Sequence, residues 1–260
     1  MQAVRILVTS ARGGVGTSSS ALHIAAALAE RGERVLLADL CSVGRSLDLL
    51  TGLSCSAVYD LGDLLLGRIA PKRAVLAVPQ AEGLYFLPGQ LSAERPATAA
   101  ELSRALATAE EAVSAAYTVL DADFDALCLA AASVVSRVLI VSDTARVSLR
   151  AAADALTRLP RSCEAALLLN RFPRCAERGS PVPPVLRMLD EVHLPLVGII
   201  PESAWLRERE EAGGAPFLGK RDDLSTAYRS VAFRLTGRRA PLLSGWRGIK
   251  RRKIIRRMLA

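Results

Sequence analysis

The chain has 260 residues, 51% of them hydrophobic, which is enough to bury the core of one sizeable α/β domain and excludes general intrinsic disorder. Only 4% of the residues are aromatic, and the apolar residues are mostly Ala, Val, Leu and Ile, a composition typical of parallel strands covered by helices. The five cysteines form no CxxC pair, so they indicate neither a disulfide framework nor a zinc site, and a reducing compartment is expected.

The net charge of +8 comes from the C-terminal end of the chain. Residues 238–260 contain nine Lys and Arg and no acid, which leaves 25 basic against 26 acidic residues in the rest. We therefore expect a domain over residues 1–237 and a basic tail over residues 238–260. No transmembrane helix is expected, because the longest apolar stretch, residues 124–141, contains Asp125 and Arg137. A charged residue in the first strand leaves no room for a signal peptide, so the expected location is cytoplasmic.

Strand-like and helix-like segments alternate along the chain, a pattern typical of a parallel sheet wrapped by helices. The first strand, residues 4–9, runs into a glycine-rich loop, residues 10–16, and then into a helix rich in Ala and Leu, residues 18–31. Further strands are predicted at residues 34–39, 84–87, 117–120, 137–142, 165–169 and 195–200, and further helices at residues 99–115 and 223–236. The predicted fold class is α/β, with a mostly parallel twisted sheet, helices on both faces and a partly amphipathic C-terminal tail.

The loop between the first strand and the first helix has the composition of a phosphate-binding site. It reads Ser10-Ala11-Arg12-Gly13-Gly14-Val15-Gly16-Thr17-Ser18-Ser19. Glycines allow a tight turn and the close approach of an anion, and a helix N-terminus supplies backbone N–H groups and positive potential. A tight strand-to-helix connection without a ligand is the alternative, which the downstream segments disfavour.

This loop resembles the deviant Walker A loop of the MinD/ParA family of P-loop ATPases, which reads Lys-Gly-Gly-x-Gly-Lys-Thr-Thr. In the family pattern, Arg12 stands where a lysine reaches the nucleotide of a second subunit, and Thr17 stands where the P-loop lysine binds phosphates. Because Thr17 carries no charge, ATP binding is expected to be weak and transition-state stabilisation weaker still. The resemblance implies these nucleotide-binding residues: Arg12, Gly13, Gly14, Val15, Gly16, Thr17, Ser18 and Ser19.

Two aspartates at strand ends complete the Mg²⁺ site that the resemblance implies. Asp39 matches the first carboxylate of the family's first switch, Asp121 matches the carboxylate that ends its Walker B strand, and Ser18 retains a hydroxyl for the metal. Strand-end capping is the alternative role for both aspartates. Cys41 stands where the family has a switch aspartate, and a thiol is a poor base for positioning water. The segment after Asp121 lacks the glycine of the family's second switch, so no catalytic residue is assigned.

Other segments match the family's scaffold, and residues 58–67 and 83–88 resemble its MinD branch. Asn170 follows a predicted strand, and the resemblance implies that it recognises adenine, whereas a turn residue at the end of a strand is the alternative. The resemblance extends over about residues 3–237. It implies a P-loop NTPase fold with ATP and Mg²⁺ as weakly bound cofactors.

The C-terminal tail interleaves cations with bulky apolar residues. Ile254, Ile255, Met258 and Leu259 share one face of a predicted helix, and Trp246 and Ile249 lie off that stripe. Such a helix can lie among lipid headgroups, where each cation adds about 1 kcal/mol of attraction to anionic lipid. A disordered basic end is the alternative, but the MinD resemblance implies a membrane-targeting helix at this place. The candidate membrane-binding residues are Trp246, Ile249, Lys250, Arg251, Arg252, Lys253, Ile254, Ile255, Arg256, Arg257, Met258 and Leu259.

Three functional hypotheses follow. The first is a MinD-like protein, peripheral on the anionic inner face of the cell membrane, that positions or regulates division, flagellar or pilus machinery and hydrolyses ATP very slowly or not at all. The second is an active ATPase in which Arg12 acts across a homodimer. The third is a DNA-associated partition-type protein or a polar scaffold resembling the pilus-assembly TadZ proteins. DNA is the less favoured partner, because only Trp246 is available among the cations of the tail to stack on bases.

Overall fold

The computed structural model describes residues 3–41, 46–90, 96–173, 182–211 and 222–240, together with Ile254, Arg257 and Met258. Eight strands of this part of the chain form one sheet in the order β3-β4-β2-β5-β1-β6-β7-β8. Neighbouring strands are parallel except for the antiparallel pair β3 and β4. The strands are β1 (Val4–Ser10), β2 (Val35–Asp39), β3 (Leu76–Ala77), β4 (Leu84–Leu87), β5 (Tyr117–Asp123), β6 (Arg137–Ser142), β7 (Ala165–Phe172) and β8 (Leu196–Pro201).

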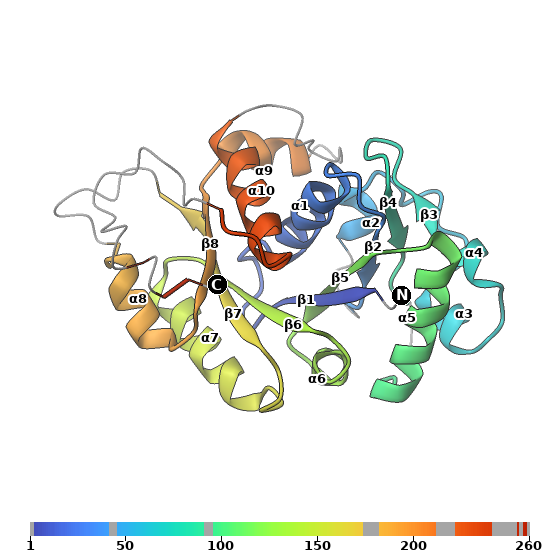
Figure 1. Cartoon of the computed structure of the whole chain (residues 1–260), viewed down its shortest axis with the longest axis horizontal. Coiled ribbons are helices and arrows are strands. Elements are labelled where there is room, and N and C mark those ends of the chain that lie inside the picture. The colour runs from blue at the N-terminus through green and yellow to red at the C-terminus, as the bar shows by residue number, and fades with distance from the viewer. Residues whose placement is uncertain are drawn as a thin grey trace.

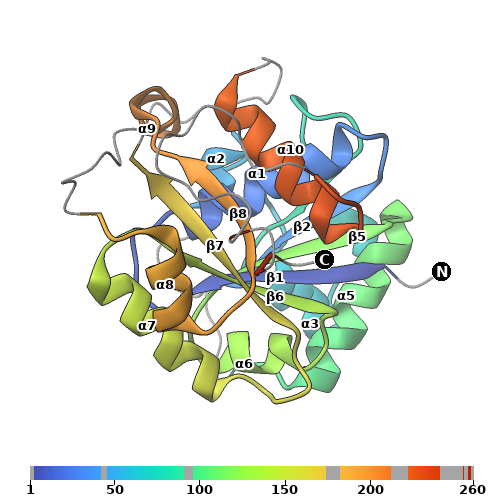
Figure 2. The same ribbon diagram turned by 60° about the vertical axis from the view of Figure 1, so that its left-hand side comes forward.

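Helices cover both faces of the sheet, as Figures 1 and 2 show from two directions. On one face α1 and α10 pack over β1, β5 and β8 through residues such as Ile24, Leu28 and Tyr228. The opposite face is covered by α5, α6, α7 and α8, which contribute Leu106 and Met188 to a second core layer. The helices are α1 (Thr17–Ala29), α2 (Leu47–Leu50), α3 (Leu61–Leu65), α4 (Pro71–Ala74), α5 (Ala99–Val113), α6 (Ala126–Ala132), α7 (Arg146–Arg158), α8 (Val185–Val192), α9 (Ala204–Glu211) and α10 (Asp223–Leu235).

The predicted fold class is confirmed, and each strand and helix predicted between residues 4 and 236 is present with ends that differ by at most three residues. The helix predicted in the tail lies mostly outside the described residues. The central strands are almost completely buried, because both faces of a parallel sheet are covered and its strands are therefore apolar throughout. Thr98 begins α5 with a capping box in which its hydroxyl accepts from the Glu101 N–H and the Glu101 carboxylate accepts from the Thr98 N–H.

A buried ion pair joins β1 to α5. Arg5, which is 2% exposed, donates to both carboxylate oxygens of Glu110 at 2.7 and 2.9 Å, and Glu110 also accepts from the Thr118 hydroxyl at 2.8 Å. A charge inside an apolar strand is tolerated here because the guanidinium and the carboxylate satisfy each other's hydrogen bonds. The pair places α5 against the amino ends of β1 and β5, far from the phosphate-type loop.

The strand order brings the carboxyl ends of β1, β2 and β5 together. Asp39 at the end of β2 is in register with Asp121 of β5, and Asp121 is in register with Val8 of β1. In open α/β sheets, ligands bind at the carboxyl ends of strands where the strand order reverses, and β1 stands at that point, between β5 and β6. The loop after β1 and both aspartates therefore lie at one place.

Candidate functional site

The loop of residues 11–16 leads directly into the N-terminus of α1. Gly14 and Gly16 have φ values of 79° and 91°, in the left-handed region that favours glycine, and Gly16 caps α1. Because Gly14 and Gly16 carry no side chains, these two positions leave the first backbone N–H groups of α1 open to a ligand. The loop conformation is therefore compatible with the anion-binding site that the sequence predicts.

The two side chains at the family's lysine positions are held within this chain. The Thr17 hydroxyl lies 2.6 Å from the Ser10 hydroxyl at the end of β1. The Arg12 guanidinium donates to the hydroxyl of Ser148 on α7 at 2.9 Å. Position 17 therefore brings a neutral hydroxyl to the loop, and the cation of Arg12 is directed toward α7.

Asp39, Cys41 and Asp121 form a buried cluster behind the loop. One ligand atom from each side chain lies within 4.8 Å of the other two, and the backbone N–H of Cys41 donates to Asp39 Oδ1 at 2.8 Å. Burial raises the pKa of Asp121 to about 7, the negative charge of Asp39 adds to this rise, and a hydrogen bond from Ser18 opposes it. Ser18, Asp39 and Asp121 are thus brought together, as the sequence predicts for a metal site.

Cys41 is a neutral thiol in this setting. Burial, and then the charges of Asp121 and Asp39, raise the pKa of the Cys41 thiol well above its ordinary value. A protonated thiol does not accept a proton from water, which agrees with the expectation that Cys41 does not replace a switch aspartate.

The segment after Asp121 is anchored rather than glycine-rich. Strand β5 continues to Asp123, and Asp125 caps α6 by accepting from the Cys128 N–H at 2.9 Å. A backbone held by a strand and a helix cap has little freedom to turn an N–H toward a γ-phosphate.

Asn170 lies against the loop at the end of β7. Its amide donates to the Val15 carbonyl at 2.9 Å, and a Cβ added at Gly16 would lie 2.4 Å from its Nδ2 atom. The cavity beside it has a volume of about 30 Å³ and is lined by Gly16, Ser19, Asn170, Arg171, Pro201, Glu202, Ser203, Leu206, Arg207 and Glu210. This volume is far below that of a small-molecule site, so an adenine ring requires α9 or Asn170 to move.

Glu210 of α9 is a site residue that the sequence did not indicate. It lines the same cavity as Asn170, and its Oε1 atom has no hydrogen-bond partner within the described ranges. Burial raises the pKa of Glu210, while a hydrogen bond from Ser19 and the charge of Arg171 lower it. An acid at this place repels phosphate, and only the packing of α9 against the loop reveals it.

Part of the tail contacts the edge of the sheet. Ile254 is 1% exposed in the core layer of α7 and α8, Met258 pairs in parallel with Leu196 of β8, and the Leu196 N–H donates to the Arg257 carbonyl at 2.9 Å. Arg257 also forms an ion pair with Asp190 of α8. The other candidate membrane-binding residues lie outside the described residues: Trp246, Ile249, Lys250, Arg251, Arg252, Lys253, Ile255, Arg256 and Leu259. Among the described residues, no helix is long and apolar enough to cross a bilayer.

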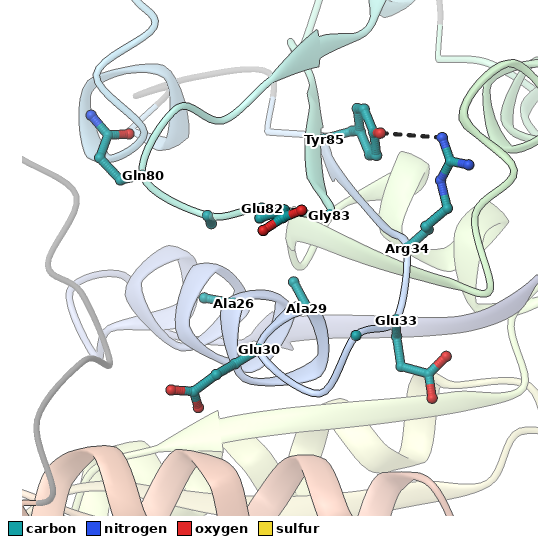
Figure 3. A pocket seen from close by; sticks show the side chains of 11 residues that line it. Ala26, Ala29, Glu30, Glu33, Arg34, Gln80, Glu82, Gly83 and Tyr85 are labelled. Atoms are coloured by element: carbon teal, nitrogen blue, oxygen red, sulfur yellow. Dashed lines mark hydrogen bonds between the residues drawn. The ribbon is translucent and has the colours of Figure 1, made fainter.

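A larger cavity of about 690 Å³ lies at the opposite end of the sheet, where α1 ends and β2 and β4 begin. Figure 3 shows Glu30, Glu33 and Glu82 around it, and Arg34, which donates to the Tyr85 hydroxyl at 3.2 Å. Its acidic rim does not suit a phosphate group, so the phosphate-type loop remains the candidate site.

Comparison with known proteins agrees with this geometry. A family model described as ParA, NUBPL iron-transfer P-loop NTPase, matches residues 2–69. The septum site-determining protein MinD of Escherichia coli K12 is 27% identical over 249 residues, which cover 91% of this chain and 92% of the relative. A chain of the MinC:MinD cell division protein complex of Aquifex aeolicus is 27% identical with a TM-score of 0.83, over 94% of this chain and 99% of that one. MinD of Pyrococcus horikoshii, solved as a complex with Mg-ADP, shares the fold at 22% identity and a TM-score of 0.73, over 89% of this chain and 95% of that one.

Proposed function

Because the chain belongs to the MinD/ParA family of P-loop NTPases and is MinD-like in fold and sequence, we propose that it is a positioning or regulatory protein with impaired ATP hydrolysis. One observation carries this proposal. The loop has a neutral threonine where phosphoryl transfer needs a cation, and Thr17 is hydrogen-bonded to Ser10. Without a cation at that place, the charge that develops on the departing γ-phosphoryl group is poorly stabilised.

The water-positioning side of the site supports the same conclusion. Cys41 is buried between two carboxylates, and its raised pKa keeps it protonated. Asp39 and Asp121 are buried at strand ends, and Ser18 hydrogen-bonds Asp121, so these oxygen donors fit a Mg²⁺ ion. When bound, Mg²⁺ supplies positive charge to phosphate oxygens. The proposed nucleotide contacts, through residues 12–19 and Asn170, therefore give weak binding rather than efficient turnover.

The proposal assigns membrane attachment to the tail, residues 238–260, and nucleotide binding to the domain, residues 1–237. The nine cations of the tail favour the anionic inner face of the cell membrane, with the protein peripheral on its cytoplasmic side. Ile254, Arg257 and Met258 contact α8 and β8 in the structure, so lipid binding through the apolar stripe requires them to leave the domain. The MinD of Aquifex aeolicus is found in a complex with MinC, and a partner from a division, flagellar or pilus system is proposed here by analogy.

Steady-state ATP hydrolysis with and without anionic vesicles tests the enzymatic part. We expect the full-length protein to release phosphate no faster than a heat-denatured control, and Thr17→Lys combined with Cys41→Asp to raise the rate. The matched control is Cys41→Asp alone, which restores a carboxylate without the missing ammonium. A Mg²⁺-dependent turnover that disappears in Arg12→Ala would support instead an active ATPase in which Arg12 acts on the nucleotide.

Vesicle sedimentation tests the membrane part. Neutralising Lys250, Arg251, Arg252 and Lys253 to Gln removes about 1 kcal/mol of attraction to anionic lipid per cation, so sedimentation with anionic vesicles should be lost. Vesicle binding that persists in this variant would contradict the role assigned to these four cations. A salt-dependent DNA shift without vesicle binding by the full-length protein would contradict the membrane assignment and favour the DNA-associated hypothesis.

A further inference from the structure

Asp39, Cys41 and Asp121 form one buried cluster at the carboxyl ends of β2 and β5. Their exposed fractions are 0%, 6% and 1%, and Cys41 Sγ lies 3.8 Å from Asp121 Oδ2. The three candidate ligand atoms lie within 4.8 Å of one another. Two carboxylates and a sulfur at this separation are a donor set for a cation. The sequence indicated Asp39 and Asp121 as oxygen donors for Mg²⁺, but it did not indicate Cys41 as a ligand beside them.

The cluster is held in place by its surroundings. The Cys41 N–H donates to Asp39 Oδ1 at 2.8 Å, which fixes the backbone of the cysteine relative to the aspartate. A Cβ added at Gly89 would lie 3.0 Å from the Asp39 carbonyl and 3.1 Å from its carboxylate carbon, so the backbone of Gly89 lies directly against this side chain. Donors fixed in this way need little reorganisation when a ligand enters.

Asp121 supplies an independent sign of a ligand. Its carboxylate is 1% exposed, and its Oδ1 atom has no hydrogen-bond partner in the part of the chain that the structure describes. Burying such an atom without a partner is unfavourable, and a bound cation would remove this penalty. The carboxylates of Asp39 and Asp121 are both buried beside Cys41, so a cation between them would be stabilised by two negative charges.

We propose that Asp39, Cys41 and Asp121 bind a thiophilic divalent cation, of the class of Zn²⁺ or Co²⁺, in the absence of nucleotide. Mg²⁺ prefers an all-oxygen shell, whereas Zn²⁺ and Co²⁺ accept sulfur together with carboxylate oxygen. Metal binding displaces the thiol proton to solvent and leaves a thiolate ligand, with no change in oxidation state. The inference does not rest on ATP binding or hydrolysis, because the donors come from β2, the residues that follow it, and β5.

Spectroscopic titration of the full-length protein, stripped of metal with EDTA and free of nucleotide, tests the site. Adding Co²⁺ should produce a near-ultraviolet thiolate-to-cobalt charge-transfer band, and Zn²⁺ should abolish it by displacement while excess Mg²⁺ leaves it. Cys41→Ser should remove the band and weaken Zn²⁺ binding by at least about tenfold. Cys128→Ser is the matched control, because Cys128 is also buried but hydrogen-bonds Thr9, and it should keep the band.

A second variant keeps the test informative if Cys41→Ser is poorly folded. Cys41→Asp preserves a ligand but removes sulfur, so it should bind Co²⁺ without the charge-transfer band and should lose its preference for Zn²⁺ over Mg²⁺. No band in the full-length protein, a band that survives in Cys41→Ser, or displacement of Co²⁺ by equimolar Mg²⁺ would each overturn the inference. None of these outcomes depends on ATP turnover, so failure here is distinct from failure of the proposed function.

Discussion

Replacing Gly16 by Ala tests whether Asn170 lies directly against the phosphate-type loop. Two effects act at this position. The φ value of 91° is costly for a residue with a Cβ, and the new Cβ would lie 2.4 Å from Asn170 Nδ2, closer than nonbonded atoms allow. Asn170 must therefore move, and its hydrogen bond to the Val15 carbonyl is lost.

The other loop glycines separate these effects. Gly13 has no neighbour within 4 Å of an added Cβ and no positive φ, so Gly13→Ala should change the free energy of unfolding by no more than about 0.5 kcal/mol. Gly14 has a φ of 79° and no such neighbour, so Gly14→Ala should cost about 1–2 kcal/mol from backbone conformation alone. Gly16→Ala adds the loss of a buried hydrogen bond, about 1–3 kcal/mol, to that backbone cost.

Urea unfolding of the three variants, followed by circular dichroism, measures these differences. The expected order of destabilisation is Gly16→Ala, then Gly14→Ala, then Gly13→Ala. Combining Gly16→Ala with Asn170→Ala should cost less than the sum of the two single variants, because the clash then has no second partner. If Gly16→Ala and Gly14→Ala were equally stable and the double variant strictly additive, Asn170 would not lie where the structure places it.

Two further predictions concern the tail and the buried acid. Asp190→Lys should replace the attraction between Asp190 and Arg257 by repulsion and release the tail. The affinity for anionic vesicles should then rise by about fivefold, a change on the order of 1 kcal/mol. Glu191→Lys, with the same charge change at the next residue, is the control, and equal gains in the two variants would contradict a specific contact. The pKa of Asp121 is raised to about 7, so the folded state holds a proton that the unfolded state releases, and stability should fall as the pH rises from about 4 to 7. Asp121→Asn should lack this fall in urea unfolding with EDTA present, and parallel pH profiles of the two proteins would disprove the assignment.

The sequence was sufficient to predict where the candidate site residues Asp39 and Asp121 lie in the fold. Asp39 and Asp121 were expected near the glycine-rich loop because apolar strands precede both residues and the carboxyl ends of parallel strands share one edge, and the register of β2 and β5 confirms this arrangement. Thr17 and Cys41 were recognised from their positions in a short motif. The placement of the aspartates needs only strand direction, whereas the assignment of Thr17 and Cys41 rests on the resemblance to the family's motifs.

The sequence did not predict which distant segments contact one another in the folded chain. Nothing near Arg12 indicates Ser148 as its partner, because α7 reaches the loop only after the sheet is assembled. Glu210 was not predicted either, because α9 lies beside Asn170 only in the folded structure. The apolar stripe of the tail led us to expect Ile254 and Met258 at a membrane surface, but a stripe does not specify its partner. In the structure, Ile254 is buried in the core and Met258 pairs with Leu196 of β8.

The hydrogen bond from Arg12 to Ser148 sets a condition on any assembly of two copies that uses this arginine. Ser148 is 2% exposed, so its hydroxyl cannot simply turn to water when the guanidinium leaves. If Arg12 reaches a neighbouring subunit, it must give up its hydrogen bond to Ser148. The Ser148 hydroxyl on α7 then needs another hydrogen-bond partner. The hydrogen bonding of Ser148 on α7 is therefore expected to change if two subunits associate through Arg12.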